Sequence, residues 1–239
     1  MTPGVGSACR RLSRRHLLVL GGSAVVVSLF GGCTSTATRS SGRAAPNATV
    51  VLVNPAGQEK SLTSAVMIGD SITLGSNEAL TASLSAAGIV NLTIDGVASR
   101  RIAVGNGTSE PLAGLKVIEQ QRAAGANPDV WIIALGTNDV GGYPDAAAYT
   151  ALIDSVIAML PADSALVWVD VYRETFLQDT ELFNTLLRDR LAARGNAVVV
   201  SWFDQVSVAD SGLLQSDRLH PNEQGRLVFA NLVAAAINR

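Results

Sequence analysis

The sequence predicts an α/β fold: one domain in which a parallel β-sheet carries helices on both faces. Three observations support this prediction. Short apolar segments of strand length alternate with longer amphipathic segments along the 239 residues. A glycine or a proline ends most of the helical segments. Polar residues follow the apolar segments directly, at the carboxyl ends of the predicted strands, where parallel sheets bind their ligands.

The strands are predicted from short runs of apolar, often β-branched residues. A first run, Thr49–Val53, is typical of an edge strand and is broken at 54–57. The core strands are predicted at Ala65–Ile68, Ile89–Ile94, Val130–Leu135, Ala165–Val171 and Ala197–Ser201. Several of these runs are apolar throughout, which indicates that both faces of the sheet are buried.

The helices are predicted from apolar residues at helical spacing. Leu112, Leu115 and Ile118 give one example, in a segment that stops at Gly125. The helical segments are Leu74–Ala87, Leu112–Ala124, Asp145–Leu160, Asp179–Arg194 and Asn222–Asn238. There is no internal repeat and no sign of a second domain.

The first 32 residues are predicted to be an export signal. Four arginines between residues 10 and 15 precede the uncharged run Leu17–Phe30, which is shorter than the ~20 residues that cross a bilayer. Ser13–Leu18 resembles a twin-arginine signal, and Phe30–Cys33 resembles a bacterial lipobox, in which the cysteine is acylated. We therefore expect a lipid on Cys33, a flexible Ser/Thr-rich tether over 33–48, and a domain over 49–239. The protein would be exported and anchored to the extracytoplasmic face of the membrane. An anchor helix that stays attached is the alternative.

Composition restricts the kinds of site that the folded body, residues 49–239, can contain. Cys9, Cys33 and His16 all lie in the first 33 residues, so His220 is the one histidine that remains when a leader is removed. This excludes a disulfide scaffold, a zinc finger and any centre with several histidines. The formal net charge of -2 gives no basic footprint for nucleic acid. We expect no cofactor and no metal.

A serine, a histidine and an aspartate are candidates for nucleophilic catalysis. Ser71 comes directly after the first core strand, where a helix begins. Any Ser–His mechanism in the body must use His220, and Asp217 lies three residues before it, close enough on one turn to orient the imidazole. The alternatives are ordinary ones: Ser71 as a helix N-cap, and a surface histidine beside a solvated aspartate.

An amide follows the third core strand, Val130–Leu135. Asn138, in Leu135–Asp139, can direct an N–H toward an acyl oxygen. A turn asparagine is the alternative, and Asp139 can cap the following segment.

These motifs together resemble the SGNH hydrolases, also called the GDSL esterase and lipase superfamily. The matching segments are Gly69–Ser71, Gly136–Asp139 and Asp217–Pro221. The resemblance implies a flavodoxin-like three-layer α/β/α fold with a parallel five-stranded sheet. It also implies a carboxylic ester hydrolase of the SGNH type.

The resemblance also implies a role for each matching residue. Ser71 would be the nucleophile, His220 the general base and then acid, and Asp217 the residue that orients His220. Asn138 would donate its side-chain amide to the oxyanion, beside the backbone N–H of Ser71.

The segment Asp95–Arg101 resembles the block of members related to peptidoglycan O-acetyltransferases, in which a glycine precedes the arginine. Here Ser99 stands at that place, and its backbone N–H is expected to be the remaining oxyanion donor. Gly96 is the second choice.

Several large polar and aromatic residues follow the predicted strands at their carboxyl ends, near the candidate site. Arg100, Tyr172 and Arg173 are the candidate substrate contacts, and Arg101 and Trp202 lie nearby. They suit a sugar or an acidic substrate; ordinary solvation of loops is the alternative.

The sequence contains no long apolar lid, which favours a short acyl group over a long-chain lipid substrate. With export, this predicts a serine esterase that acts on acyl esters of a cell-envelope carbohydrate or lipid. Two alternatives stay open. One is an O-acyltransferase that uses the same residues on an envelope glycan, and the other is a non-catalytic, glycan-binding lipoprotein.

Overall fold

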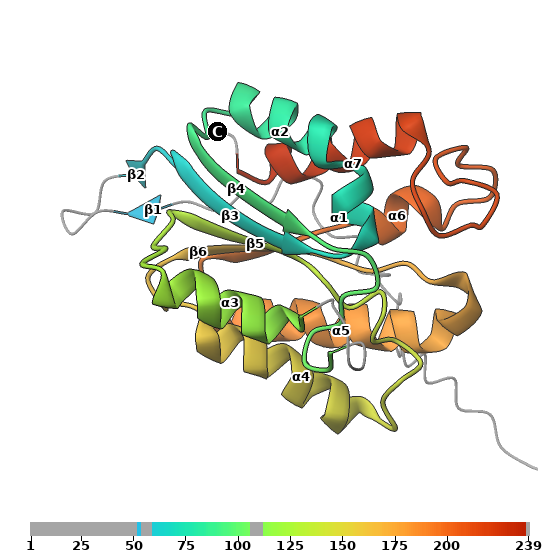
Figure 1. Ribbon diagram of the computed structural model, residues 1–239. Coiled ribbons are helices and arrows are strands. Elements are labelled where there is room, and N and C mark those ends of the chain that lie inside the picture. Colours follow the sequence, from blue (N-terminus) through green and yellow to red (C-terminus); the bar gives the residue numbers. More distant parts are fainter. Residues whose placement is uncertain (1–51, 54–58, 106–111, 238–239) are drawn as a thin grey trace, which may run out of the picture. The chain divides into compact units, whose positions relative to one another are not determined.

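The computed structural model describes residues 52–53, 59–105 and 112–237. The predicted signal peptide (1–32), Cys33 and the tether (33–48) lie outside the described residues. Five parallel strands form one sheet in the order β4-β3-β5-β6-β7 (Figure 1). They are β3 (Ser64–Gly69), β4 (Asn91–Gly96), β5 (Val130–Ala134), β6 (Ala165–Val169) and β7 (Ala197–Val200). The predicted parallel sheet is therefore confirmed.

The order of the strands places a reversal of winding at β3, and the carboxyl end of this strand is where a site is expected. The chain passes from β3 to β4 on one side and then to β5 on the other, so the direction of winding reverses at β3. Gly69, the last residue of β3, lies opposite Gly96 of β4 and Ala134 of β5. Three strands thus end level with one another, and the loops that follow them meet at the point where open α/β sheets form their sites.

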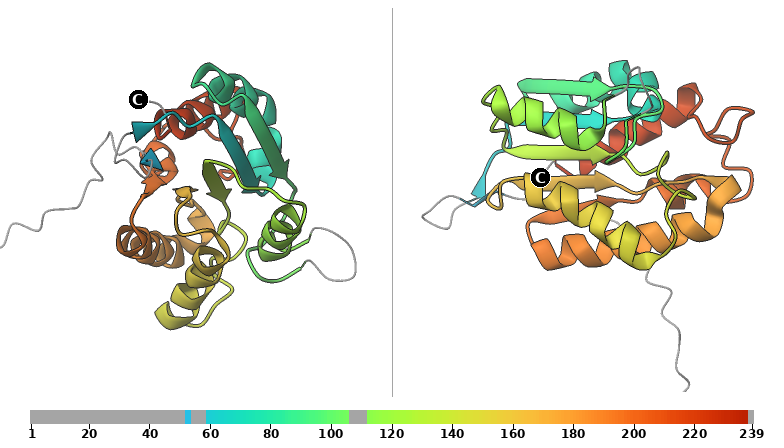
Figure 2. Two further views of the ribbon diagram at one scale, coloured as in Figure 1. Left: turned by 90° about the vertical axis from the view of Figure 1, so that its left-hand side faces the viewer. Right: turned by 60° about the horizontal axis from the view of Figure 1, so that its bottom comes forward.

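Helices cover both faces of the sheet (Figures 1 and 2). A separate apolar core lies on each face. One core includes residues of α1, α2, α6 and α7, and the other includes residues of α3, α4 and α5. The bounds are α1 (Ser71–Gly75), α2 (Asn77–Ala86), α3 (Gly114–Ala123), α4 (Ala146–Met159), α5 (Leu177–Arg194), α6 (Trp202–Val206) and α7 (Glu223–Ala235), with a 3-10 turn η1 (Glu174–Phe176) before α5. This is the three-layer arrangement that was expected. No helix within the described ranges is both long and apolar enough to cross a membrane.

Two predicted elements differ from the structure. The helix predicted at Leu74–Ala87 is two helices, α1 and α2, which meet at Ser76. The run Thr49–Val53 was predicted to be an edge strand, and its residues 49–51 lie outside the described residues. Instead β1 (Leu52–Val53) pairs antiparallel with β2 (Glu59–Lys60) in a small sheet of its own. A pairing between neighbouring segments closes a short loop, which costs less entropy than docking on a distant strand.

Candidate active site

Ser71 is the first residue of α1 and sits at the carboxyl end of β3. The turn into the helix is tight: a Cβ at Gly69 would lie 1.9 Å from Thr73 Oγ1, so only glycine fits there. Asp70 stabilises the turn as the helix N-cap, because its Oδ1 accepts the Ile72 N–H at 2.9 Å. Ser71 itself is half-buried.

The structure brings Ser71, His220 and Asp217 together in one chain of contacts. Ser71 Oγ lies 2.9 Å from His220 Nε2, although the two residues are 149 positions apart. The other ring nitrogen, Nδ1, lies 2.7 Å from Asp217 Oδ2. With its proton on Nδ1, the imidazole presents the lone pair of Nε2 to the serine hydroxyl.

Asp217 also folds the loop that carries the histidine. Its Oδ1 accepts the backbone N–H groups of Leu219 and His220, each at 3.0 Å. Arg218, which lies between Asp217 and Leu219, has a φ of 56°, in the left-handed region. Hydrogen bonds from the His220 ring and from these two N–H groups lower the pKa of Asp217 to about 2. The carboxylate is therefore charged at any physiological pH and can hold the Nδ1 proton of the ring.

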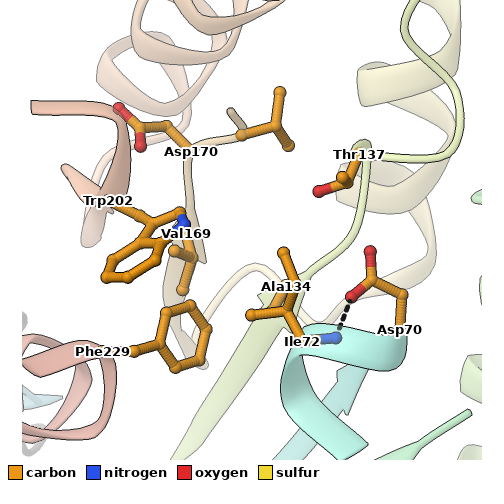
Figure 3. Close-up of a pocket in the computed structure, with 9 residues that line it drawn as sticks. Asp70, Ile72, Ala134, Thr137, Val169, Asp170, Trp202 and Phe229 are labelled. Carbon is orange, nitrogen blue, oxygen red and sulfur yellow. Dashed lines mark hydrogen bonds between the residues drawn. The ribbon is translucent and has the colours of Figure 1, made fainter. Parts of the chain in front are cut away.

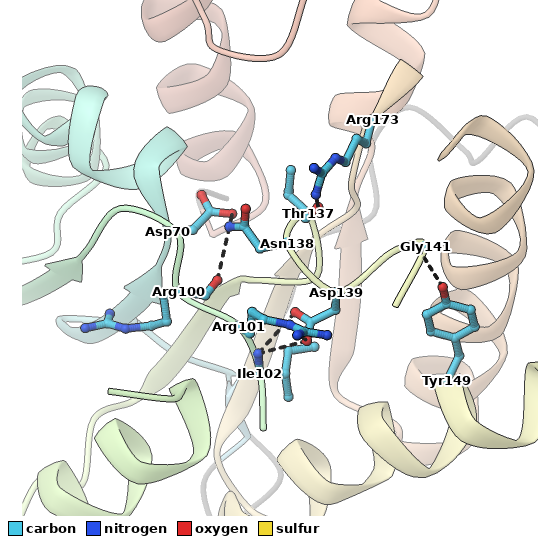
Figure 4. A network of polar contacts seen from close by, with 10 residues as sticks. All are labelled: Asp70, Arg100, Arg101, Ile102, Thr137, Asn138, Asp139, Gly141, Tyr149 and Arg173. Atoms are coloured by element: carbon cyan, nitrogen blue, oxygen red, sulfur yellow. Dashed lines mark hydrogen bonds and ion pairs between the residues drawn. The ribbon is translucent and has the colours of Figure 1, made fainter. Parts of the chain in front are cut away.

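Asn138 lies in the turn after β5 and reaches toward the loop after β4 (Figure 4). Its Nδ2 donates to Asp70 Oδ2 at 3.3 Å and to the Arg100 carbonyl at 3.1 Å. Both hydrogens of the amide thus already have acceptors within the protein. To bind an oxyanion, Asn138 must exchange or share one of these bonds.

The loop after β4 puts Ser99 in an unusual backbone conformation. Its φ of 61° lies in the left-handed region, which favours glycine. The glycine that the resemblance places here would adopt this φ without strain. Val97 N–H donates to the Gly69 carbonyl at 3.2 Å, so the loop starts against the end of β3. Gly96 has a packing reason to be glycine, because a Cβ there would lie 2.6 Å from the Leu74 nitrogen of α1.

Arg100 is poorly placed for the predicted contact with substrate, and this role stays a prediction. Its side chain is only 3% exposed and forms an ion pair with Asp95 at 2.8 Å. The guanidinium also donates to the carbonyls of Gly69, Asp95 and Leu112. Arg100 therefore ties the ends of β3 and β4 together, and four of the five N–H hydrogens of its guanidinium are used within the protein.

Tyr172 is also poorly suited to contact substrate, since it is 5% exposed and its ring packs against Phe203. Arg173 is partly buried; it donates to the Thr137 carbonyl at 3.0 Å and lies over the Phe176 ring. Its substrate role stays a prediction. Trp202 is buried in the core at 1% exposure and is not at the mouth of the site.

Three carboxyl groups are buried at this end of the sheet: Asp70, Asp139 and Asp170, exposed by 1%, 0% and 3%. Asp70 and Asp170 line a small cavity of about 10 Å³, together with Thr137 and the Trp202 ring (Figure 3). Burial raises the pKa of Asp70 to about 6 and the pKa values of Asp139 and Asp170 to about 7, against the lowering effect of backbone N–H donors.

Sequence reasoning missed the contacts of these acids. Asp70 and Asp139 are direct neighbours of Ser71 and Asn138, so the motifs contained the signal. Capping of the following segment was one alternative for Asp139. Its two carboxylate oxygens instead lie 3.1 and 3.2 Å from the Ile102 N–H, in a loop 37 residues away. No pattern along the chain reveals such a partner. Within the described ranges, no three His, Cys, Asp or Glu side chains are grouped as ligands of a metal ion.

Comparisons with known proteins agree with this fold and these motifs. A model of the GDSL-like Lipase/Acylhydrolase family matches residues 67–227. No match to the sequence was found among curated proteins.

Several solved structures are similar to the chain. The C-terminal catalytic domain of peptidoglycan O-acetyltransferase A from Streptococcus pneumoniae has 19% identity and a TM-score of 0.54, with 74% of this chain and 92% of that chain covered. A lipolytic protein of the G-D-S-L family from Veillonella parvula has 20% identity and a TM-score of 0.55, covering 71% and 95%. A family 3 carbohydrate esterase from Clostridium thermocellum has 19% identity and a TM-score of 0.52, covering 72% and 93%. At these identities the similarity is one of fold.

Proposed function

Because the chain belongs to the GDSL-like lipase/acylhydrolase family, we propose that it is a serine esterase that hydrolyses short acyl esters. Ser71 is the nucleophile, His220 the general base and then acid, and Asp217 the group that orients His220. The observation that carries this proposal is the pair of contacts at 2.9 and 2.7 Å that joins the three side chains. Nucleophile and base lie within hydrogen-bond reach, and a third group fixes the base.

The reaction has two steps. Ser71 Oγ attacks the ester carbonyl carbon while His220 Nε2 takes the hydroxyl proton. The tetrahedral intermediate collapses, the C–O bond to the alcohol breaks, and His220 returns the proton to the leaving alkoxide. Water then attacks the acyl-serine with His220 again as base, which releases the carboxylic acid and restores Ser71.

The oxyanion that forms in each step needs donors beside Ser71. We assign this role to the backbone N–H groups of Ser71 and Ser99 and to the side-chain amide of Asn138. Two observations support the assignment: Asn138 lies in contact with Asp70, next to the nucleophile, and the loop of Ser99 starts against the end of β3. Such donors act most strongly where they are already oriented before the reaction.

For the substrate we propose an acyl ester on a cell-envelope carbohydrate or lipid, with a short acyl group. The similarity of fold to a carbohydrate esterase and to a peptidoglycan O-acetyltransferase domain supports a carbohydrate ester. The N-terminal sequence supports the location, because it predicts export and a lipid on Cys33. Exchange of Cys33 for serine should abolish labelling of the protein by radioactive palmitate in cells and release it from the membrane fraction.

Transfer of the acyl group to a sugar hydroxyl is the second candidate, favoured by the similarity to the O-acetyltransferase domain. Both reactions share the acyl-serine and differ in what discharges it. Burst kinetics with an activated acetyl ester, with and without acceptor glycan, separate them. A transferase accelerates turnover with the glycan and forms acetylated glycan, whereas a hydrolase releases acetate at the same rate.

The central experiment is covalent labelling of Ser71 by a fluorophosphonate, combined with hydrolysis of esters of increasing chain length. We expect labelling at Ser71, loss of labelling in Ser71→Ala, and the highest kcat/KM on acetyl esters. Absence of both labelling and turnover would refute the esterase and leave a non-catalytic, glycan-binding protein.

A further inference from the structure

The turn after β5 holds the segment 100–102 with two neighbouring side chains (Figure 4). Asn138 donates to the Arg100 carbonyl at 3.1 Å. Asp139, the next residue, accepts the Ile102 N–H at 3.1 Å. One turn therefore contacts the segment at both of its ends, immediately after Ser99.

Asp139 is well suited to hold this segment rigidly. Its side chain is fully buried, and its backbone is fixed by bonds from its own N–H to the Gly136 carbonyl and from Gly142 N–H to its carbonyl. Arg101 Nε lies 3.6 Å from Asp139 Oδ1 and supplies a positive charge close to the buried carboxylate. A buried acceptor that pairs with a backbone N–H and faces a cation restrains the geometry around it.

We propose that Asp139 is a positioning residue for the oxyanion hole, acting through Ile102 and Arg101 to fix the segment on which Asn138 and Ser99 depend. The inference rests on the proposed function. Asp139 itself touches neither Ser71 nor His220 among the contacts of the described residues. Asp139 affects the reaction by fixing the segment that carries the Arg100 carbonyl. This carbonyl accepts a hydrogen bond from the Asn138 amide and so orients it.

The protein contains a matched control for this role. Asp170 is also a buried carboxyl group; it accepts the Phe203 N–H at 2.7 Å, and Arg188 Nη1 lies 3.6 Å from its Oδ2. It thus has similar burial, the same kind of donor and the same distance to a cation, although its Oδ2 accepts no hydrogen bond. Among the contacts of the described residues, none joins Asp170 to Asn138 or to residues 99–102. A purely structural role predicts the same result for both acids.

The test is a double-mutant cycle. Asp139→Asn and Asp170→Asn are each made in the wild-type protein and in Asn138→Ala, and kcat and KM are measured on an activated acetyl ester beside thermal unfolding. We expect Asp139→Asn to lower kcat by about 10-fold, less than the roughly 30- to 150-fold expected for loss of the Asn138 amide, with KM nearly unchanged. In the Asn138→Ala background this loss should shrink by at least about 3-fold. Asp170→Asn should leave kcat within about 2-fold in both backgrounds while it shifts the unfolding temperature.

Equal losses of kcat in both backgrounds, or an equal loss for Asp170→Asn, would overturn the positioning role. Should Asp139→Asn not fold, Arg101→Gln takes its place in the same cycle, because Arg101 is 29% exposed and its exchange leaves the buried carboxyl group intact. Equal losses of kcat for Arg101→Gln in the wild-type and Asn138→Ala backgrounds, or an equal loss for Asp170→Asn, would again overturn the positioning role. Ser71→Ala separates this result from the proposed function: if turnover survives in Ser71→Ala, the esterase mechanism fails, whatever Asp139 does.

Discussion

Exchange of Asn138 for alanine removes an amide that the protein holds in two hydrogen bonds, to Asp70 and to the Arg100 carbonyl. A donor to an oxyanion stabilises the transition state by ~3–4 kcal/mol. Here the amide must give up one existing bond to serve the oxyanion, and such a bond is worth about 1 kcal/mol. The net contribution is therefore ~2–3 kcal/mol, so we expect kcat to fall by roughly 30- to 150-fold. KM should change little, because the interaction belongs to the transition state.

The same exchange affects stability. Two partly buried hydrogen bonds disappear, and Asp70, only 1% exposed, loses the donor to its Oδ2. We expect the free energy of unfolding to fall by about 1–3 kcal/mol, which leaves the protein folded at room temperature. Initial rates over a range of ester concentrations give kcat and KM, and urea unfolding gives the stability.

Asn184→Ala is the matched control, because this buried amide bonds only the backbone of Val171, at 2.9 and 2.8 Å, among the described contacts. It should lower stability and leave kcat within about 3-fold. The reasoning is refuted if Asn138→Ala keeps the wild-type kcat, or if the control loses as much kcat as Asn138→Ala.

Three further predictions follow from the site. Ser71→Ala and His220→Ala should each abolish nearly all turnover of an acetyl ester, because members of a triad act as a unit, and appreciable initial rates would contradict the mechanism. Asp217→Asn should lower kcat by about 10²- to 10⁴-fold without unfolding the protein, since its side chain is 47% exposed; kinetics and circular dichroism check both parts. The free energy of unfolding should fall as the pH rises from about 4 to 7. Burial raises the pKa of Asp170 from 3.8 to about 7, so the folded protein binds more protons than the unfolded chain in this window. Asp170→Asn should reduce this fall by on the order of 4 kcal/mol at most, and urea unfolding at pH 4 and pH 8 with an unchanged difference would show otherwise.

The alternation of apolar and amphipathic segments was sufficient to predict the sheet and its covering helices. The strand predicted at Val130–Leu135, for example, corresponds to β5 at Val130–Ala134. Local pattern was insufficient where tertiary contacts decide. The break between α1 and α2 at Ser76 falls inside a continuous helical pattern, and the partner of β1 is a polar segment, Glu59–Lys60, with no strand signal.

The candidate site shows the same division. The proximity of Ser71 and His220 was predictable because a single histidine remains in the body and the motifs follow strand ends. The burial of Arg100 was not, because the carbonyl groups that its guanidinium satisfies belong to Gly69, Asp95 and Leu112 and carry no sequence signature. The left-handed φ of Ser99 is likewise a property of the folded loop.

Ser71 and His220 stand near opposite ends of the described domain, 149 positions apart. During translation Ser71 and all five strands are therefore synthesised before His220. On the proposed mechanism, a nascent or prematurely terminated chain can fold much of its scaffold while its alcohol stays unreactive. The protein can then cleave esters only after its C-terminal segment has been synthesised, when α7 packs against α2 and the preceding loop brings His220 to Ser71. A protease that cuts between α6 and Asp217 would place the base and the nucleophile on two different fragments of the chain by breaking one peptide bond.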